Sequence, residues 1–229
     1  MDTLTRTPTP LAIEPLTSTE APDRRRTLAG LLLAVTGIGI VLSTITNEAL
    51  YPAGRAYSTY ANTISDLGGT LPPDSYMVQP NRAIFIVTMA VAGALVLAST
   101  YLLRATIRRR RMLVALGAMG VGLVGIAIFP GNVAGWHPLF SLVAFVGGSV
   151  ATIMSRKELD PPASYLAVAL GVIALVATAL GLDAFAEAWP QTAIGIGGVE
   201  RWIAYPVLLW MVLFGTALMG KAPRGGSRA

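Results

Sequence analysis

Residues 82–103 read RAIFIVTMAVAGALVLASTYLL, and Arg82 at the start is the only charged side chain in this run. A helix needs about 20 mostly apolar residues to cross a bilayer, because it rises about 1.5 Å per residue through about 30 Å of hydrocarbon. This stretch is long enough and apolar enough to do so. It therefore predicts a membrane-spanning helix.

Five other apolar runs of similar length accompany it. Prolines mark several of their ends: Pro130 closes one run, Pro138 opens the next, and Pro162 precedes the fifth. Proline suits the first turn of a helix and interrupts a helix interior. Because backbone polar groups in lipid must be satisfied within the chain, we predict an all-α integral membrane protein with six transmembrane helices. The predicted spans are 27–46, 82–103, 112–129, 138–155, 164–182 and 201–220, within one domain of residues 27–220.

The composition supports a membrane protein. Charged residues make up 13% of the chain and hydrophobic residues 54%, whereas a soluble domain carries about 25% charged residues. The net charge of +5 comes from basic residues in short clusters between the apolar runs, which argues against a nucleic-acid partner. The chain has no cysteine and one histidine, a poor donor set for disulfides, iron–sulfur clusters or zinc. We expect no metal and no cofactor.

Both ends of the chain look unlike the apolar runs. Residues 1–26 are rich in threonine and proline and lack apolar periodicity, so we predict a disordered tail there and a second tail at 221–229. The arginines at 24–26 precede an apolar run, as in a signal peptide. That run is too long for a signal sequence and lacks a small-residue cleavage site. We therefore predict an uncleaved first transmembrane helix.

The placement of basic residues predicts the orientation. With the N-terminus in the cytoplasm, all but three of the 17 Lys and Arg residues fall on the inner side. The exceptions are Arg55, Arg82 and Arg201. The positive-inside rule then predicts cytoplasmic N- and C-termini. The arginine cluster at 108–111 is explained as an orientation determinant, and binding to anionic lipid headgroups is the alternative.

Glycines gather in the predicted third and fourth helices. Gly117, Gly120, Gly122 and Gly125 lie in the third, and Gly147 and Gly148 in the fourth. Small residues let transmembrane helices approach closely. We interpret these positions as packing seams within the chain. The alternative is a homo- or hetero-oligomer contact through these two helices.

The longest connection between apolar runs, residues 47–80, contains YSTYANTISDLGG at 57–69. Loops this long are uncommon unless they are functional or disordered. The predicted topology places this loop on the outer face with the starts of the second, fourth and sixth helices, whose free N–H groups favour anions. We predict an outward-facing pocket for a membrane-lipid headgroup or a small polar ligand. Its predicted residues are Asn62, Ser65, Asp66, Asn81, Arg82, His137, Glu200 and Arg201.

Four of these residues also have a structural interpretation. Asp66 can form an Asx turn or cap a short helix before Gly68 and Gly69. His137 can cap the start of the fourth helix. Glu200 can form an intramembrane ion pair with Arg201 or join a network with Asp66, although ionisable groups at a membrane edge are candidates for function.

An enzyme acting on lipid-linked substrates is a second hypothesis, with Asp66 or Glu200 as general base and His137 as acid–base partner. A triad of Ser65, His137 and Asp66 is disfavoured because Ser65 and Asp66 are adjacent and no nucleophile elbow occurs. The near absence of charges inside the runs disfavours an ion-coupled transporter. A structural or assembly subunit of a membrane complex is the third hypothesis.

Four motifs resemble the uncharacterised multi-pass membrane protein family DUF998 of bacteria and archaea. They are NTISDLG at 62–68, NRAIF at 81–85, GIAIFP at 125–130 with His137 downstream, and GVER at 198–201. The resemblance spans about residues 27–220 and implies a six-helix fold, a shared outer site and a bacterial-type cell membrane. The Ser-Asp-Leu-Gly loop and the Phe-Pro…His pairing are also similar, more distantly, to the Frag1/DRAM/Sfk1 membrane proteins, which are linked to lipid handling. The resemblance implies no reaction.

Overall fold

The computed structural model describes residues 23–54, 57–73, 75–185 and 193–220, and within them it contains six long α-helices and no strand. Each of the six is long and apolar enough to cross a membrane. This confirms the prediction of an all-α, six-helix protein. The helices are α1 (Arg24–Ala49), α2 (Asn81–Leu103), α3 (Arg110–Ile128), α4 (Trp136–Met154), α5 (Ala163–Phe185) and α6 (Gly195–Gly220), with short 3-10 helices η1 (Ser65–Leu67) and η2 (Ser155–Glu158).

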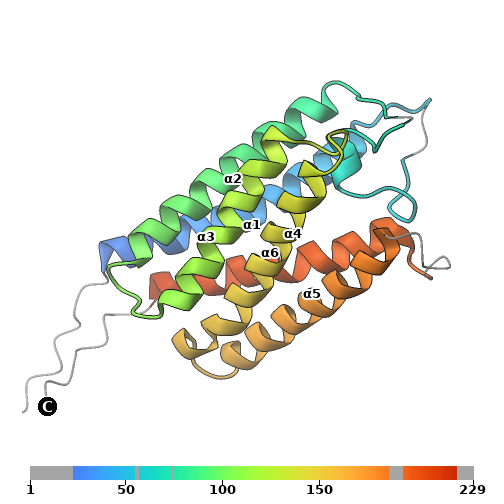
Figure 1. Ribbon diagram of the computed structural model, residues 1–229. Helices are drawn as coiled ribbons and strands as arrows, with labels where there is room; N and C mark the ends of the chain where they lie inside the picture. Colours follow the sequence, from blue (N-terminus) through green and yellow to red (C-terminus); the bar gives the residue numbers. More distant parts are fainter. Residues whose placement is uncertain (1–22, 55–56, 74, 186–192, 221–229) are drawn as a thin grey trace, which may run out of the picture.

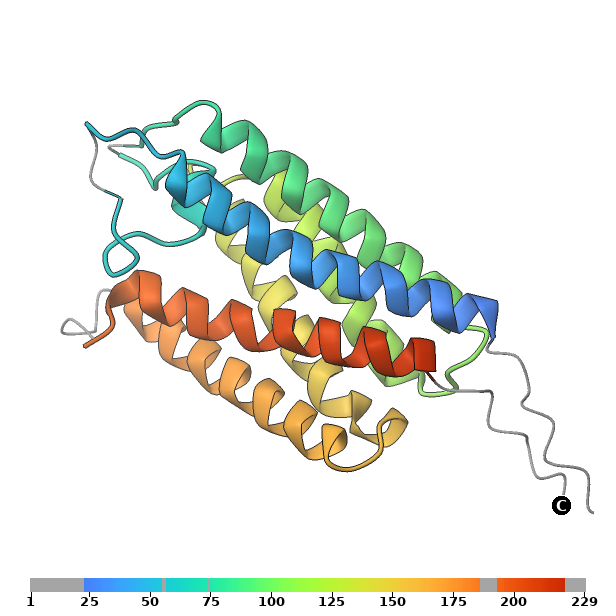
Figure 2. The ribbon, with the colours of Figure 1, turned by 180° about the vertical axis from the view of Figure 1, so that it is seen from behind.

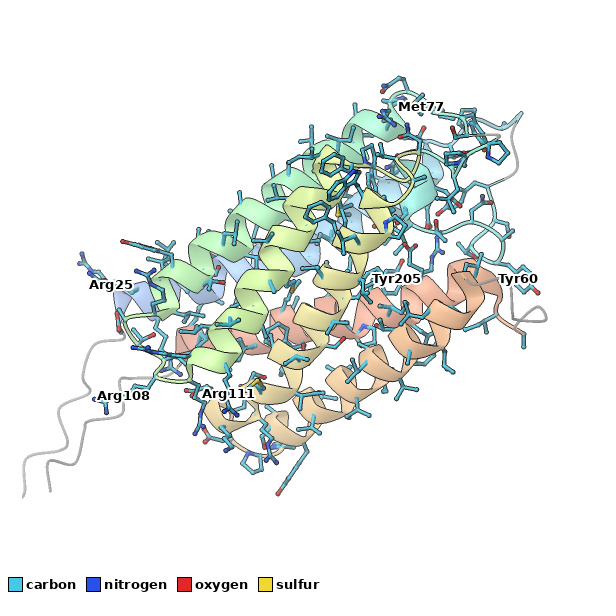
Figure 3. The ribbon with its side chains drawn as sticks, viewed as in Figure 1. Arg25, Tyr60, Met77, Arg108, Arg111 and Tyr205 are labelled. Atoms are coloured by element: carbon cyan, nitrogen blue, oxygen red, sulfur yellow. The ribbon has the colours of Figure 1, made fainter. Side chains whose placement is uncertain are left out.

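The helices form a closed bundle in which each packs on its neighbours in the chain, and α6 packs back on α1 (Figure 1). The start of α1 and the end of α6 lie at the same end, which we call the terminal end (Figure 2). The opposite end carries the α1–α2 and α3–α4 connections, and we call it the loop end. Arg25, Arg108 and Arg111 lie at the terminal end, whereas Tyr60 and Met77 lie at the loop end (Figure 3).

Apolar side chains fill the bundle and also cover its outside. Trp210 and Phe214 are fully buried and stack on each other inside the bundle. Outward-facing Val87, Val114 and Ile128 are each more than 60% exposed. A surface of this kind is stable against lipid tails rather than water. The bundle is therefore built as a multi-pass membrane protein.

Glycines bring α3 and α4 into close contact. A Cβ atom on Gly122 would lie 2.5 Å from the Ala144 nitrogen, and one on Gly147 would lie 2.8 Å from the Ala115 carbonyl oxygen. Both distances are too short for a side chain, so the helix backbones meet at these positions. The glycines thus serve as packing seams within the chain. An oligomer contact through α3 and α4 stays a prediction.

Helix α6 begins at Gly195, six residues before the predicted start at 201. Gly195 has a φ of +66°, and a side chain there would collide with the Tyr60 carbonyl. The Gly197 N–H donates to the same carbonyl at 3.0 Å. The glycine-rich start of α6 therefore lets the loop lie directly against the helix. As a result, Glu200 and Arg201 stand in the second turn of α6 rather than at its N-terminus.

Helix α1 begins at Arg24, where the sequence predicted a tail, and Asp23 caps it by accepting from the Arg25 N–H at 2.9 Å. A polar cap with no apolar periodicity around it gave no signal of this earlier start. The rest of the predicted tails, 1–22 and 221–229, lies outside the described residues.

Candidate ligand cavity at the loop end

Asp66 shapes the loop through a reciprocal pair of bonds with Thr63. Its Oδ2 accepts from the Thr63 N–H at 2.9 Å, and the Thr63 hydroxyl oxygen accepts from the Asp66 N–H at 3.1 Å. This is a capping box, with Asp in the place usually held by Glu. The Asn62 side-chain amide donates to the same Oδ2 at 3.3 Å. Asp66 thus has the capping role considered for it, and these bonds hold η1 in place.

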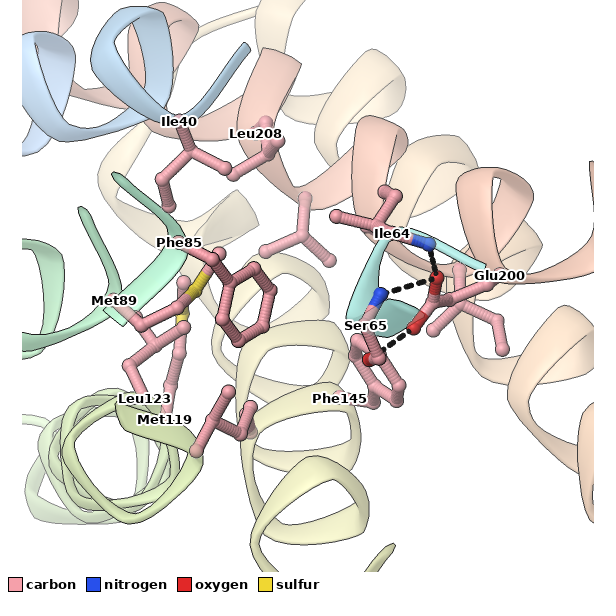
Figure 4. Close-up of a pocket in the computed structure, with 15 residues that line it drawn as sticks. Ile40, Ile64, Ser65, Phe85, Met89, Met119, Leu123, Phe145, Glu200 and Leu208 are labelled. Atoms are coloured by element: carbon pink, nitrogen blue, oxygen red, sulfur yellow. Dashed lines mark hydrogen bonds between the residues drawn. The ribbon is translucent and has the colours of Figure 1, made fainter. Parts of the chain in front are cut away.

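Glu200 reaches from α6 to the start of η1. Its Oε1 accepts from the Ser65 hydroxyl at 2.7 Å, and its Oε2 accepts from the Ile64 N–H and, at 3.4 Å, the Ser65 N–H (Figure 4). Glu200 is only 6% exposed. A carboxylate that satisfies buried N–H groups ties α6 to the loop. The predicted ion pair between Glu200 and Arg201 is absent from the described contacts, because adjacent helical residues point in different directions.

Arg201 instead joins α6 to α1 and to the loop. Its Nη2 forms an ion pair with Glu48 and donates to the Tyr57 hydroxyl at 2.8 Å. Its Nη1 donates to three backbone carbonyls, those of Thr59 (3.3 Å), Asn62 (3.1 Å) and Gly197 (2.8 Å). The planar guanidinium suits such a branched set of acceptors.

Tyr57 is the loop residue that completes this network. Its hydroxyl donates to the Thr63 carbonyl at 2.9 Å while it accepts from Arg201. Burial raises the pKa of the Tyr57 phenol above its ordinary value, although the nearby Arg201 opposes the shift. The phenol therefore stays protonated and keeps its donor for the loop.

Asn81 and Arg82, both predicted ligand residues, have structural contacts and do not line the cavity described below. The Asn81 amide donates to the Asn47 side-chain oxygen at 2.6 Å, and Asn47 donates back to the Asn81 carbonyl at 3.0 Å. Asn81 is fully buried between α1 and α2. Arg82 donates to the Gly68 carbonyl at 2.8 Å and to Asn132 Oδ1 at 2.7 Å. It thereby fastens the α1–α2 loop to the α3–α4 loop.

His137 stands at the second residue of α4 and connects it to the end of α3. Its Nδ1 lies 2.8 Å from the Phe129 carbonyl oxygen, and its Nε2 lies 3.4 Å from the Ser141 hydroxyl. A carbonyl can only accept, so Nδ1 carries the hydrogen of the ring. In the neutral imidazole, Nε2 is then an acceptor. Ser141 is four residues further along the same helix face.

A cavity of about 830 Å³ lies between α4, α5, α6 and the η1 loop. Its polar lining near the loop comprises Tyr60, Thr63, Ser65, Asp66, His137 and Glu200, and Ser141 of α4 and Thr178 of α5 line it about a turn or more deeper. Its apolar lining includes Leu139, Leu142 and Phe145 of α4, Leu182 of α5, and Val199 and Ile203 of α6. A smaller cavity of about 70 Å³ shares Ser65, Phe145, Glu200 and Ile203 with it (Figure 4).

Four of the eight predicted ligand residues line the large cavity, namely Ser65, Asp66, His137 and Glu200. The sequence analysis missed Ser141, although its spacing from His137 placed both on one helix face. Thr178 was also missed, because it stands alone in the apolar run of α5. The pairing of Glu48 with Arg201 was not foreseen, because the two residues are 153 positions apart. Within the described residues, no group of three or more His, Asp or Glu side chains is placed to hold a metal ion.

Six apolar helices of membrane-spanning length, with a cavity between three of them and the η1 loop, define a multi-pass membrane protein. The profile of the family described as "Protein of unknown function (DUF998)" matches residues 49–217. This match covers most of the chain, so the protein belongs to the DUF998 family, as the four motifs indicated. No significant match was found among curated proteins or solved structures. The more distant similarity to Frag1/DRAM/Sfk1 proteins stays a prediction.

Proposed function

We propose that this membrane protein binds a lipid headgroup or a small polar ligand in the large cavity, without transforming it. The observation that carries the proposal is a cavity of about 830 Å³ with apolar walls and one polar end. Ligand pockets typically measure about 300–1,000 Å³ and combine apolar walls with a few polar groups. An amphipathic molecule fits both parts of this lining.

The position of the cavity supports a lipid. The cavity lies toward the loop end of six membrane-length helices. A bilayer with about 30 Å of hydrocarbon around these helices would place that end near its headgroups. A headgroup can reach the polar residues near η1 while the chains stay beside the apolar parts of α4 and α5. A water-soluble ligand would not need the long apolar wall.

We expect wild-type protein, purified in mild detergent, to carry a discrete adduct of lipid mass in native mass spectrometry. Asp66→Asn and His137→Ala should carry a smaller fraction of the adduct than the wild type while remaining folded, because both residues line the polar end of the cavity. Thr216→Ala is the matched control, since Thr216 bonds only within α6, to Val212 and Leu213, and does not line the cavity. A wild-type protein without any adduct would contradict the proposal.

The enzyme alternative rests on the 3.4 Å contact between His137 Nε2 and the Ser141 hydroxyl, which pairs a base with a nucleophile. Glu200 is a poor base because η1 occupies both of its oxygens. An enzyme would convert the bound lipid over time in the same spectra, whereas His137→Ala would retain it unconverted. A stable adduct on the wild type would argue against turnover.

We also propose that the loop end faces outward across a cell membrane, with both termini in the cytoplasm. The support is the gathering of arginines at the terminal end, among them Arg25, Arg108 and Arg111 (Figure 3). Because the chain lacks cysteine, single cysteines report the orientation directly. In intact cells, Ser58→Cys should react with an impermeant thiol reagent and Ala105→Cys should not. The reverse pattern would overturn the orientation.

A further inference from the structure

The polar end of the large cavity offers hydrogen-bond acceptors. Asp66 Oδ2 holds the loop, but Asp66 Oδ1 has no hydrogen bond among the described residues. His137 is 5% exposed, lines the same cavity, and presents Nε2 as an acceptor with only the 3.4 Å contact to Ser141. A ligand group that bonds to these atoms must donate hydrogen bonds, and at Nε2, which has one lone pair, it takes the place of the Ser141 hydroxyl.

The described charged residues that line the cavity are all acidic. Asp66 and Glu200 both line the cavity, and none of its described lining residues is Lys or Arg. Glu200 is hydrogen-bonded to the loop within the chain, so Asp66 is the acidic lining residue with an oxygen left for a ligand. An anionic group would meet repulsion here, whereas a cation that donates hydrogen bonds would meet complementary charge. At the start of α6, the Gly197 N–H already donates to the Tyr60 carbonyl, so this N–H is not available to an anionic ligand.

The cavity also has an apolar side toward the outside of the bundle. At the Gly171 level, α5 lies close to α4, since a Cβ on Gly171 would lie 2.9 Å from the Ser149 carbonyl oxygen. Toward the loop end the two helices diverge (Figure 1, Figure 2). Among the described residues, a Cβ on Gly181 of α5 would meet side chains of α6 alone, those of Val199 and Ile203. Leu139 and Leu182 line the cavity from the diverging helices and are 47% and 50% exposed.

We infer that the ligand is a membrane lipid whose headgroup carries a protonated amine, and that it reaches the cavity sideways from the bilayer between α4 and α5. This inference rests on the proposed lipid-binding function and specifies its ligand class. The ammonium donates to Asp66 Oδ1 and His137 Nε2. An acyl chain leaves the cavity between Leu139 and Leu182. Lateral access keeps the chains in an apolar environment throughout, so the lipid need not cross water.

The ligand class is tested by adding lipids to delipidated protein and measuring bound fractions by native mass spectrometry. Three lipids with identical chains are compared: phosphatidylethanolamine, phosphatidylcholine and phosphatidylglycerol. Phosphatidylethanolamine should bind about tenfold more tightly than phosphatidylcholine, whose ammonium has no hydrogen to donate. Phosphatidylglycerol, which has hydroxyl donors but a net negative charge, should bind most weakly. Equal binding of all three would overturn the amine preference and leave the lipid-binding function standing. Binding of none would overturn both.

Asp66→Asn should reduce the preference for phosphatidylethanolamine over phosphatidylcholine to about twofold, because the charged acceptor is lost. Asn62→Ala is the matched control. It removes one donor to Asp66 Oδ2 and leaves the Asp66 carboxylate in the cavity, so the preference should persist. If Asp66→Asn fails to fold, the wild-type order of the three lipids still decides the inference. An unchanged preference in folded Asp66→Asn would overturn it.

The proposed entry of lipid between α4 and α5 is tested by replacing one side chain there with a larger one. Leu182→Trp should slow the uptake of phosphatidylethanolamine from vesicles several-fold, because Leu182 borders the opening. Leu180→Trp lies on the same helix, is 43% exposed and does not line the cavity, so it should leave the rate unchanged. Equal rates for both variants and the wild type would exclude this route.

Discussion

Replacing Glu200 by alanine should lower the free energy of unfolding by about 3 kcal/mol, because each buried donor left without a partner costs about 1–3 kcal/mol. The change leaves the Ile64 N–H and the Ser65 hydroxyl without their carboxylate. It also removes a side chain that lines both cavities. We expect the η1 loop to separate from α6 and any bound lipid to be lost with it. Thermal unfolding in detergent and native mass spectrometry measure the two effects.

Glu200→Gln is the matched comparison. Glutamine keeps one acceptor oxygen of similar reach, so it can still accept from the Ile64 and Ser65 N–H groups, whereas its NH₂ group cannot accept from the Ser65 hydroxyl. It should lose about half as much stability as alanine, since part of the hydrogen bonding survives. If glutamine and alanine are equally destabilising, the negative charge itself holds the loop. If neither variant lowers the unfolding temperature, Glu200 does not anchor η1.

The fold was predictable because each membrane-spanning helix can be recognised from its own stretch of sequence. The run at 82–103 needs only its own length and apolar composition to be recognised. The start of α6 was not predictable in this way. Glycines at 195, 197 and 198 are typical of a loop when the sequence is considered alone. In the structure they form the first turn of α6, and the Tyr60 carbonyl packs so closely against this turn that side chains would not fit.

Several residues of the candidate site were predictable, but the contacts between them were not. Ser65, Asp66, His137 and Glu200 stood out as polar residues between apolar runs, and all four line one cavity. Their partners were hidden by distance along the chain. Glu200 meets Ser65 across 135 positions, and Arg201 meets Glu48 across 153. Neighbours in sequence suggested a Glu200–Arg201 pair, yet successive helical residues face different elements.

Replacing Arg201 by methionine should be the other strongly destabilising change, lowering the free energy of unfolding by about 3–5 kcal/mol. Methionine fills a similar volume but leaves Glu48 as an uncompensated charge that is 22% exposed. It also removes the donor to the carbonyls of Thr59, Asn62 and Gly197. Both effects act on the contact between α1, α6 and the loop, so the unfolding temperature in detergent should fall sharply.

A double-mutant cycle separates the contribution of the Arg201–Glu48 ion pair from that of the hydrogen bonds that the planar guanidinium makes to the loop. Glu48→Gln removes the charge opposite Arg201, so adding it to Arg201→Met should restore part of the lost stability, because no unpaired carboxylate then remains. Arg201→Lys keeps the positive charge but cannot reach Glu48 and the loop carbonyls together, since an ammonium lacks the planar fork of a guanidinium. It should recover the ion pair and not the loop contacts. Strict additivity in the cycle, with lysine as good as arginine, would mean that the five bonds of Arg201 do not act as one anchor.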